Sequence, residues 1–288
     1  MAAKPLRSAL YMPGANTRAL EKARSLNADA FIFDLEDAVA PDKKAEAREN
    51  ICRAVKQGGY RGRTLVIRIN ALSSAWGKED VAAAAAAQPD AILLPKVETS
   101  ADIQELAHLI TQFGDLSKTA IWAMMETPRG ILNAPQIAAA HPRLDAMVMG
   151  TSDLVKDLHA AHTSLRLPVL VALGQCLLAA RAEGLSILDG VHLDIEDNIG
   201  LHEACLQGRE FGFDGKTLIH PRQVETANAV FGPKAEEIEH ANQIIRAYDE
   251  AMAQGRAVAL LDGRLIENLH VEEARRLVAL AQTISTFE

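Results

Sequence analysis

Between residues 8 and 221, short apolar runs alternate eight times with longer segments of helix-forming residues. The runs are apolar throughout rather than at every second position, which is typical of parallel strands covered on both faces. Eight βα units predict an α/β fold, a (β/α)₈ TIM barrel, more than an open doubly wound sheet. The expected strands are 8–13, 30–37, 64–70, 91–97, 121–127, 146–150, 186–192 and 217–220.

The pattern changes after Pro221. One amphipathic helix is expected at 235–255, followed by two short strands that meet at Asp262-Gly263 and by a final helix. We therefore predict a barrel domain over 1–222 and a C-terminal appendage of helices and a hairpin over 223–288. The appendage is too small to expect as a self-standing fold, so it should dock on a barrel, its own or a neighbour's.

Composition limits the class of function. The net charge is −8, which argues against a nucleic-acid surface. The longest apolar stretches are too short to cross a bilayer, and the N-terminus lacks the pattern of a secretory signal. Three distant cysteines, Cys52, Cys176 and Cys205, indicate neither a disulfide framework nor a cysteine zinc site, so a reducing cytoplasm is the expected setting. The absence of G-x-G-x-x-G after the first strand, and of a P-loop, weakens the nucleotide-binding alternative.

Two acids leave the ends of consecutive strands. Glu126 ends "IWAMMET" and Asp153 follows "AMVMG". In a TIM barrel such ends share one mouth, where a lone acid is as often a helix cap or a salt bridge as a functional group. Two unpaired carboxylates in one place would repel, and a divalent cation removes that cost. Oxygen ligands completed by water and substrate suit Mg²⁺.

Arg68 lies inside the otherwise apolar "LVIRIN" and must reach water or an anion. Its planar fork matches a substrate carboxylate, although a structural pair with Glu36 or Asp37 is the alternative. Glu36 and Asp37 are expected to orient Arg68 or a ligand without binding the metal themselves. Lys96 could suggest a Schiff-base aldolase, but beside several acids it should stay protonated, which argues against that chemistry.

Several segments together resemble the citrate lyase beta-subunit-like branch of the HpcH/HpaI aldolase family. They are "SALYMPGANTRALEKA", "DAFIFDLEDAVAPDKKAEAREN", "VIRIN", "ILLPKVE", "METPRGILNAPQIA", "GTSDL" and "GFDGKTLIHPRQVETANAVF". This branch includes malyl-CoA lyases, citramalyl-CoA lyases and malyl-CoA thioesterases. The resemblance implies a TIM barrel, Mg²⁺, and cleavage or formation of the C–C bond between acetyl-CoA or propionyl-CoA and a 2-oxoacid such as glyoxylate or pyruvate.

The resemblance also implies roles for single residues. The metal ligands fall on Glu126 and Asp153, with Glu126 also facing the substrate, and the 2-oxoacid-binding arginine falls on Arg68. The CoA-contacting positions of the family fall on Tyr11, Asn16 and Lys22. Asn16 departs from the arginine common in malyl-CoA lyases, and Arg18 lies close enough in sequence to substitute for it.

A catalytic aspartate of the lyases, donated by an adjacent subunit, is matched here by Glu267 in "DGRLIENLH". The resemblance thus implies a homo-oligomer, a trimer or hexamer, in which the appendage contributes to a neighbouring site. The glutamate shifts the carboxylate by about one methylene, and a shift near 1 Å can cost on the order of a hundredfold in rate. A C–C lyase remains the first expectation. The alternatives are a (3S)-malyl-CoA thioesterase, which this segment resembles more closely, and a citrate lyase beta-type subunit of a larger complex.

Overall fold

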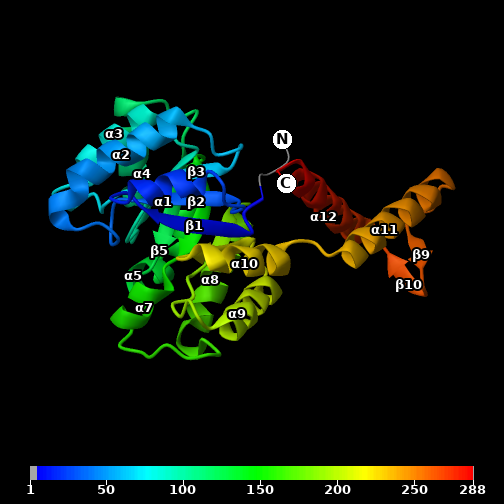
Figure 1. The fold of residues 1–288 in the computed structure, drawn as a ribbon. Coiled ribbons are helices and arrows are strands. Elements are labelled where there is room, and N and C mark those ends of the chain that lie inside the picture. Colours follow the sequence, from blue (N-terminus) through cyan, green and yellow to red (C-terminus); the bar gives the residue numbers. More distant parts are fainter. Residues whose placement is uncertain (1–4, 288) are drawn as a thin grey trace. The chain divides into compact units, whose positions relative to one another are not determined.

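The computed structural model describes residues 5–287, and its core is a closed barrel of eight parallel strands (Figure 1). Each strand pairs with the next in sequence, and β1 pairs with β8 to close the barrel. The predicted TIM barrel is therefore confirmed. The strands are β1 (Ser8–Pro13), β2 (Ala30–Asp34), β3 (Thr64–Arg68), β4 (Ala91–Leu94), β5 (Ala120–Met125), β6 (Leu144–Met149), β7 (Ser186–Asp189) and β8 (Gly215–Leu218).

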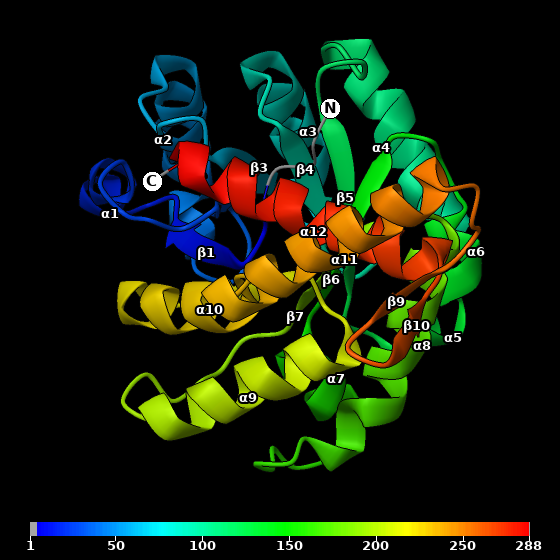
Figure 2. The same ribbon diagram turned by 90° about the vertical axis from the view of Figure 1, so that its right-hand side faces the viewer.

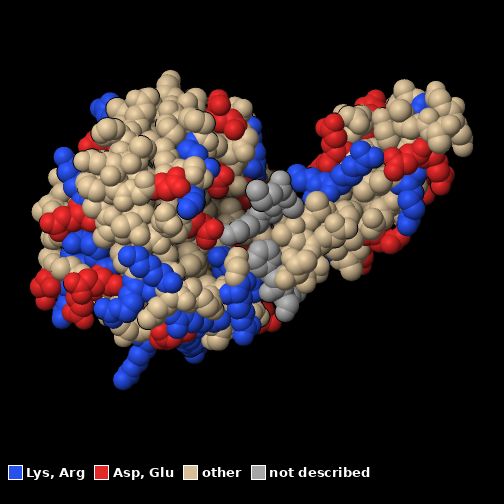
Figure 3. Space-filling model, turned by 90° about the horizontal axis from the view of Figure 1, so that it is seen from above, with Lys and Arg blue, Asp and Glu red and all other residues tan. Residues whose placement is uncertain are grey.

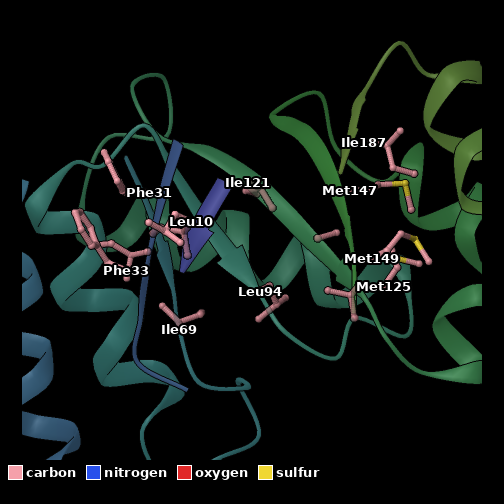
Figure 4. Close-up of a cluster of buried hydrophobic side chains, with 14 of the residues drawn as sticks. Leu10, Phe31, Phe33, Ile69, Leu94, Ile121, Met125, Met147, Met149 and Ile187 are labelled. Atoms are coloured by element: carbon pink, nitrogen blue, oxygen red, sulfur yellow. The ribbon is translucent and has the colours of Figure 1, made fainter. Parts of the chain in front are cut away.

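The two faces of each strand are both buried, which explains why the runs are apolar at every position. Inward side chains such as Ile32, Leu93 and Trp122 fill the barrel. The outward side chains pack under the surrounding helices and include Leu10, Phe31, Phe33 and Met147 (Figure 4). The filled interior leaves the loops at the carboxyl ends of the strands as the place for chemistry.

Helices surround the strands (Figure 2). They are α1 (Thr17–Ala23), α2 (Lys44–Gln57), α3 (Gly77–Ala87), α4 (Ser100–Phe113), α5 (Pro128–Leu132), α6 (Ala134–Ala138), α7 (Thr151–Asp157), α8 (Leu170–Ala182), α9 (Asn198–Phe211) and α10 (Val224–Phe231), with single 3₁₀ turns at Pro41–Lys43, Leu167–Val169 and Pro221–Gln223. Acidic and basic side chains lie interspersed on the barrel face seen in Figure 3. Within residues 5–287, no helix has the length and apolarity that a membrane span requires.

The chain divides into two compact units, the barrel unit Leu6–Phe231 and a second unit whose described residues are Pro5 and those from Gly232 onward. It contains α11 (Ala235–Ala253), β9 (Ala259–Leu261), β10 (Arg264–Ile266) and α12 (Asn268–Phe287). The sequence predicts a boundary after residue 222, whereas the barrel unit extends to Phe231. The reason is that α10 packs against α9, β1 and β8 and so belongs to the barrel unit. The hairpin turns at Asp262 and Gly263, both with positive φ, as an Asp-Gly pair favours.

Candidate active site

Arg68 ends β3 and forms a two-pronged ion pair with Asp34 at the end of β2. Arg68 Nε and Nη2 each donate to an oxygen of Asp34 at 2.7 Å. Arg68 Nη1 lies 2.9 Å from Glu36 Oε2 and 3.7 Å from Asp37 Oδ2. The expected partners Glu36 and Asp37 are therefore present, but the main partner is Asp34, which the sequence reasoning missed. The signal that could have found this partner is that residues 34 and 68 end consecutive strands, whose register places them side by side.

The Arg68–Asp34 pair is buried, with 7% and 1% of each residue exposed. Burial by itself would raise the pKa of Asp34, but the adjacent guanidinium and the N–H groups of Glu36 and Ala38 hold it below its ordinary value. The Arg68 guanidinium also stacks on the Tyr11 ring, 4.8 Å from its centre. Burial raises the pKa of the Tyr11 phenol, so this ring is a neutral platform under the guanidinium.

Glu126 follows β5 directly and is 2% exposed. Thr127 caps α5 through Gly130 N–H at 3.0 Å, and Pro128 occupies the first helical position, so the chain turns into a helix immediately after the acid. Burial, and next the charge of Glu36, raises the pKa of Glu126 to about 7. Gly150 makes room for this side chain, because a Cβ there would lie 2.4 Å from Glu126 Cβ and 2.5 Å from Oε2.

Asp153 lies in the first turn of α7, with 28% of its side chain exposed. Lys96 links it to the other acids. The Lys96 backbone N–H donates to Glu126 Oε1 at 2.8 Å, its ammonium donates to Glu36 Oε1 at 2.6 Å, and the same ammonium lies 3.7 Å from Asp153 Oδ2. The acids predicted to meet at the mouth, Glu126 and Asp153, thus border one common residue.

The sequence suggests no role for Lys96 beyond that of a Schiff-base lysine. Burial by itself would lower its pKa, but the hydrogen bond to Glu36 and the nearby acids raise it above its ordinary value. The amine is therefore protonated, as expected, and acts as a cation among carboxylates. No local signal in "LLPKVE" shows this role, since the partners of Lys96 come from the segments that follow β2 and β5 and from α7.

Lys44 fixes the loop that carries Glu36. Its buried ammonium donates to the carbonyls of Leu35 and Glu36, both at 2.7 Å, and to Asn70 Oδ1 at 2.8 Å. These carbonyls belong to the two peptide groups that flank the Glu36 Cα, so one ammonium sets the direction in which the Glu36 side chain leaves the chain.

The donor set suits a hard cation. Glu36, Glu126 and Asp153 offer only oxygen, and Glu36 lies close enough to Glu126 for its charge to raise the pKa of Glu126. Over the described part of the chain, no group of three or more His, Cys, Asp or Glu has the geometry of a complete protein-only metal site. The carboxylate oxygens of Glu126 and Asp153 are of the type that Mg²⁺ prefers, and water and substrate would have to complete such a two-carboxylate site.

The remaining expected site residues take no part in these contacts. Arg18 and Lys22 are exposed on α1, and Asn16 caps that helix by accepting from Ala19 N–H at 3.1 Å. Glu267 belongs to the C-terminal unit, exposed between β10 and α12, and its N–H donates to His270 Nδ1 at 3.0 Å. The barrel thus brings together Tyr11, Glu36, Asp37, Arg68, Glu126 and Asp153.

Residues 7–221 match the model of the family described as HpcH/HpaI aldolase/citrate lyase. The chain is 51% identical to a (3S)-malyl-CoA thioesterase of Cereibacter sphaeroides over 99% of this chain and 98% of that protein. It is 32% identical to the citrate lyase subunit beta of Escherichia coli over 96% and 93% of the two chains. A crystal structure of CitE from Mycobacterium tuberculosis in complex with magnesium, acetoacetate and coenzyme A superimposes with a TM-score of 0.79 at 29% identity, covering 98% and 99% of the two chains. The chain is thus an enzyme of the HpcH/HpaI aldolase/citrate lyase family, as its motifs indicated.

Proposed function

We propose that this chain is a Mg²⁺-dependent thioesterase that hydrolyses a malyl-CoA-like thioester to malate and CoA. The observation that carries this proposal is the 51% identity to a (3S)-malyl-CoA thioesterase, which extends over nearly the whole of both chains. The sequence alone placed a C–C lyase first. The full-length identity favours the thioesterase, and the same two acids are proposed to hold Mg²⁺ in either activity.

Hydrolysis requires water to attack the thioester carbonyl carbon, the C–S bond to break, and a proton to reach the departing thiolate. Mg²⁺ held by Glu126 and Asp153 would supply a Lewis acid for substrate oxygens. Arg68 would orient the malyl carboxylate through Nη1, since its Nε and Nη2 are committed to Asp34. A bound carboxylate would therefore share Nη1 with Glu36, 2.9 Å away.

Other proposed roles rest on the family resemblance. Tyr11, Arg18 and Lys22 are proposed for the CoA side of the site. Arg18 and Lys22 are exposed cations that suit the phosphates of CoA. Glu267 is proposed as the base that takes a proton from the attacking water. The appendage that carries it is proposed to contribute to oligomer contacts and to a neighbouring active site in a homotrimer or hexamer.

A C–C lyase is the second candidate. Its support is the similarity to the CitE structure with magnesium, acetoacetate and coenzyme A. That reaction would yield acetyl-CoA and glyoxylate or pyruvate from malyl-CoA or citramalyl-CoA. The third candidate, a beta-type subunit of a citrate lyase complex, is supported by the 32% identity to such subunits.

One experiment separates these activities. The purified chain is incubated with Mg²⁺ and either malyl-CoA or citramalyl-CoA, and free thiol and 2-oxoacid are assayed separately. A thioesterase releases thiol without oxoacid, whereas a lyase releases oxoacid without thiol. Failure to turn over either free thioester, while a carrier-bound substrate is cleaved, would favour the complex subunit.

The metal assignment has its own test. Glu126→Gln and Asp153→Asn should each lose activity and Mg²⁺ binding while the unfolding temperature of the metal-free protein stays close to that of wild type. Full activity in EDTA would refute the assignment.

Subunit mixing tests Glu267. If Glu267 completes a neighbouring site, inactive Glu267→Ala and inactive Arg68→Ala subunits should regain part of the activity when combined. No recovery after confirmed exchange of subunits would place Glu267 in its own barrel's site or outside the mechanism.

A further inference from the structure

Lys96 has an unusual backbone for a residue with a side chain. Its φ is +52°, in the left-handed region, which costs roughly 1–3 kcal/mol and persists where surrounding contacts enforce it. The contacts here are with acids. The backbone N–H donates to Glu126 at 2.8 Å, and the ammonium donates to Glu36 at 2.6 Å and lies 3.7 Å from Asp153. One residue therefore contacts three carboxylates from three different segments.

The charges around Lys96 do not cancel. Arg68 pairs with Asp34 and also reaches Glu36 Oε2 through Nη1 at 2.9 Å, whereas Lys96 contacts all three of Glu36, Glu126 and Asp153. Asp34, Glu36, Glu126 and Asp153 face the two cations Arg68 and Lys96, so the fully ionised cluster keeps two negative charges, which one divalent ion would balance. The same arrangement places the ammonium and an incoming Mg²⁺ among the same oxygens.

We propose that Lys96 is a tethered counter-cation of the metal site, which holds the acids together before Mg²⁺ binds and weakens the binding of Mg²⁺. The inference rests on the proposed function only in placing the metal at Glu126 and Asp153. Two positive charges a few ångström apart repel. For a divalent ion about 5 Å from an ammonium, this repulsion is worth roughly tenfold in affinity even at the dielectric constant of water. Removing the ammonium should therefore tighten the site, which is the opposite of what loss of a ligand does.

The test is isothermal titration of the full-length protein with MgCl₂ alone. Lys96→Met keeps the backbone N–H to Glu126 and removes the ammonium, with its charge and its hydrogen bond to Glu36. The matched control is Lys78→Met, which makes the same change in net charge. Lys78 lines the same cavity of about 500 Å³ as Pro95 and Lys96. We expect Lys96→Met to bind Mg²⁺ about tenfold more tightly than wild type, with Lys78→Met and Lys96→Arg close to wild type.

A second readout follows from linkage. Without the ammonium the acids repel, so metal-free Lys96→Met should unfold at a lower temperature than wild type, and saturating Mg²⁺ should raise its unfolding temperature by more. Mg²⁺ affinity in Lys96→Met that is unchanged or weaker, or equal tightening in Lys78→Met, would overturn the proposal. Wild-type protein that binds no Mg²⁺, or Glu126→Gln that binds it as well as wild type, would instead refute the metal assignment.

A measurement on wild-type protein covers the case in which Lys96→Met does not fold. Lysines are labelled with a trace of acetic anhydride with and without saturating Mg²⁺, and the modified peptides are counted by mass spectrometry. Mg²⁺ at Glu126 and Asp153 would take the Asp153 oxygen from the ammonium and repel it, so labelling of Lys96 should rise with Mg²⁺ while labelling of Lys78 stays constant. Equal or slower labelling of Lys96 would contradict the shared-carboxylate arrangement.

Discussion

Asp34→Asn should be among the most damaging conservative substitutions in the barrel mouth. Asp34 accepts two hydrogen bonds from Arg68 at 2.7 Å, and both side chains are more than nine-tenths buried. An asparagine would aim its NH₂ at one of those guanidinium donors and leave a buried cation short of its main counter-charge. Breaking a buried pair by removing one partner costs about 3–5 kcal/mol. Because Glu36 and Asp37 still lie near Nη1, we expect the lower end, about 3 kcal/mol.

The assay is urea unfolding of metal-free protein, with thiol release from malyl-CoA measured alongside. The matched control is Asp37→Asn, the same change on a side chain that is 65% exposed and 3.7 Å from Arg68, which should cost less than about 1 kcal/mol. Asp34→Asn should also lower activity at least tenfold, since Arg68 loses its fixed orientation.

The effect should depend on pH with a definite sign. The pKa of Asp34 is lower in the folded than in the unfolded protein, so its stabilisation is present above the unfolded pKa of about 3.9 and is lost as pH falls through the folded value. The difference in the free energy of unfolding between wild type and Asp34→Asn should therefore be largest at pH 7 and become smaller in acid. If Asp34→Asn lowers the free energy of unfolding by less than about 1 kcal/mol at pH 7, or if Asp37→Asn lowers it equally, this account of the Arg68–Asp34 pair is refuted.

Two further predictions concern Glu126. Gly150→Ala would place a Cβ 2.4 Å from Glu126 Cβ, so the Glu126 side chain must move. Titration calorimetry should then show Mg²⁺ affinity reduced at least tenfold. The control Gly174→Ala, where a Cβ meets open space, should leave the Mg²⁺ affinity unchanged. Normal Mg²⁺ binding in Gly150→Ala would show that the carboxylate position is not critical. Because the pKa of Glu126 is raised to about 7, protonation should compete with the metal below that pH, so Mg²⁺ affinity should fall by about tenfold in total as pH is lowered from 8 to 6. Calorimetric affinities that do not vary with pH would contradict this.

The sequence by itself determined the barrel, since continuous apolar runs are a local signature of strands buried on both faces. It also placed Arg68, Glu126 and Asp153 at the mouth, because the ends of parallel strands share one edge. Asp262-Gly263 marked the hairpin turn for an equally local reason, the tolerance of these residues for positive φ.

Tertiary structure alone decided which side chains pair with one another at the barrel mouth. Asp34 belongs to Arg68 because the register of β2 on β3 sets them side by side. Lys96 becomes the cation of the acid cluster because three segments distant in the chain converge on it. The end of the barrel unit at Phe231 depends on the packing of α10 against α9, β1 and β8. Each of these depends on contacts between segments far apart in the chain, whose geometry is fixed only when the barrel closes.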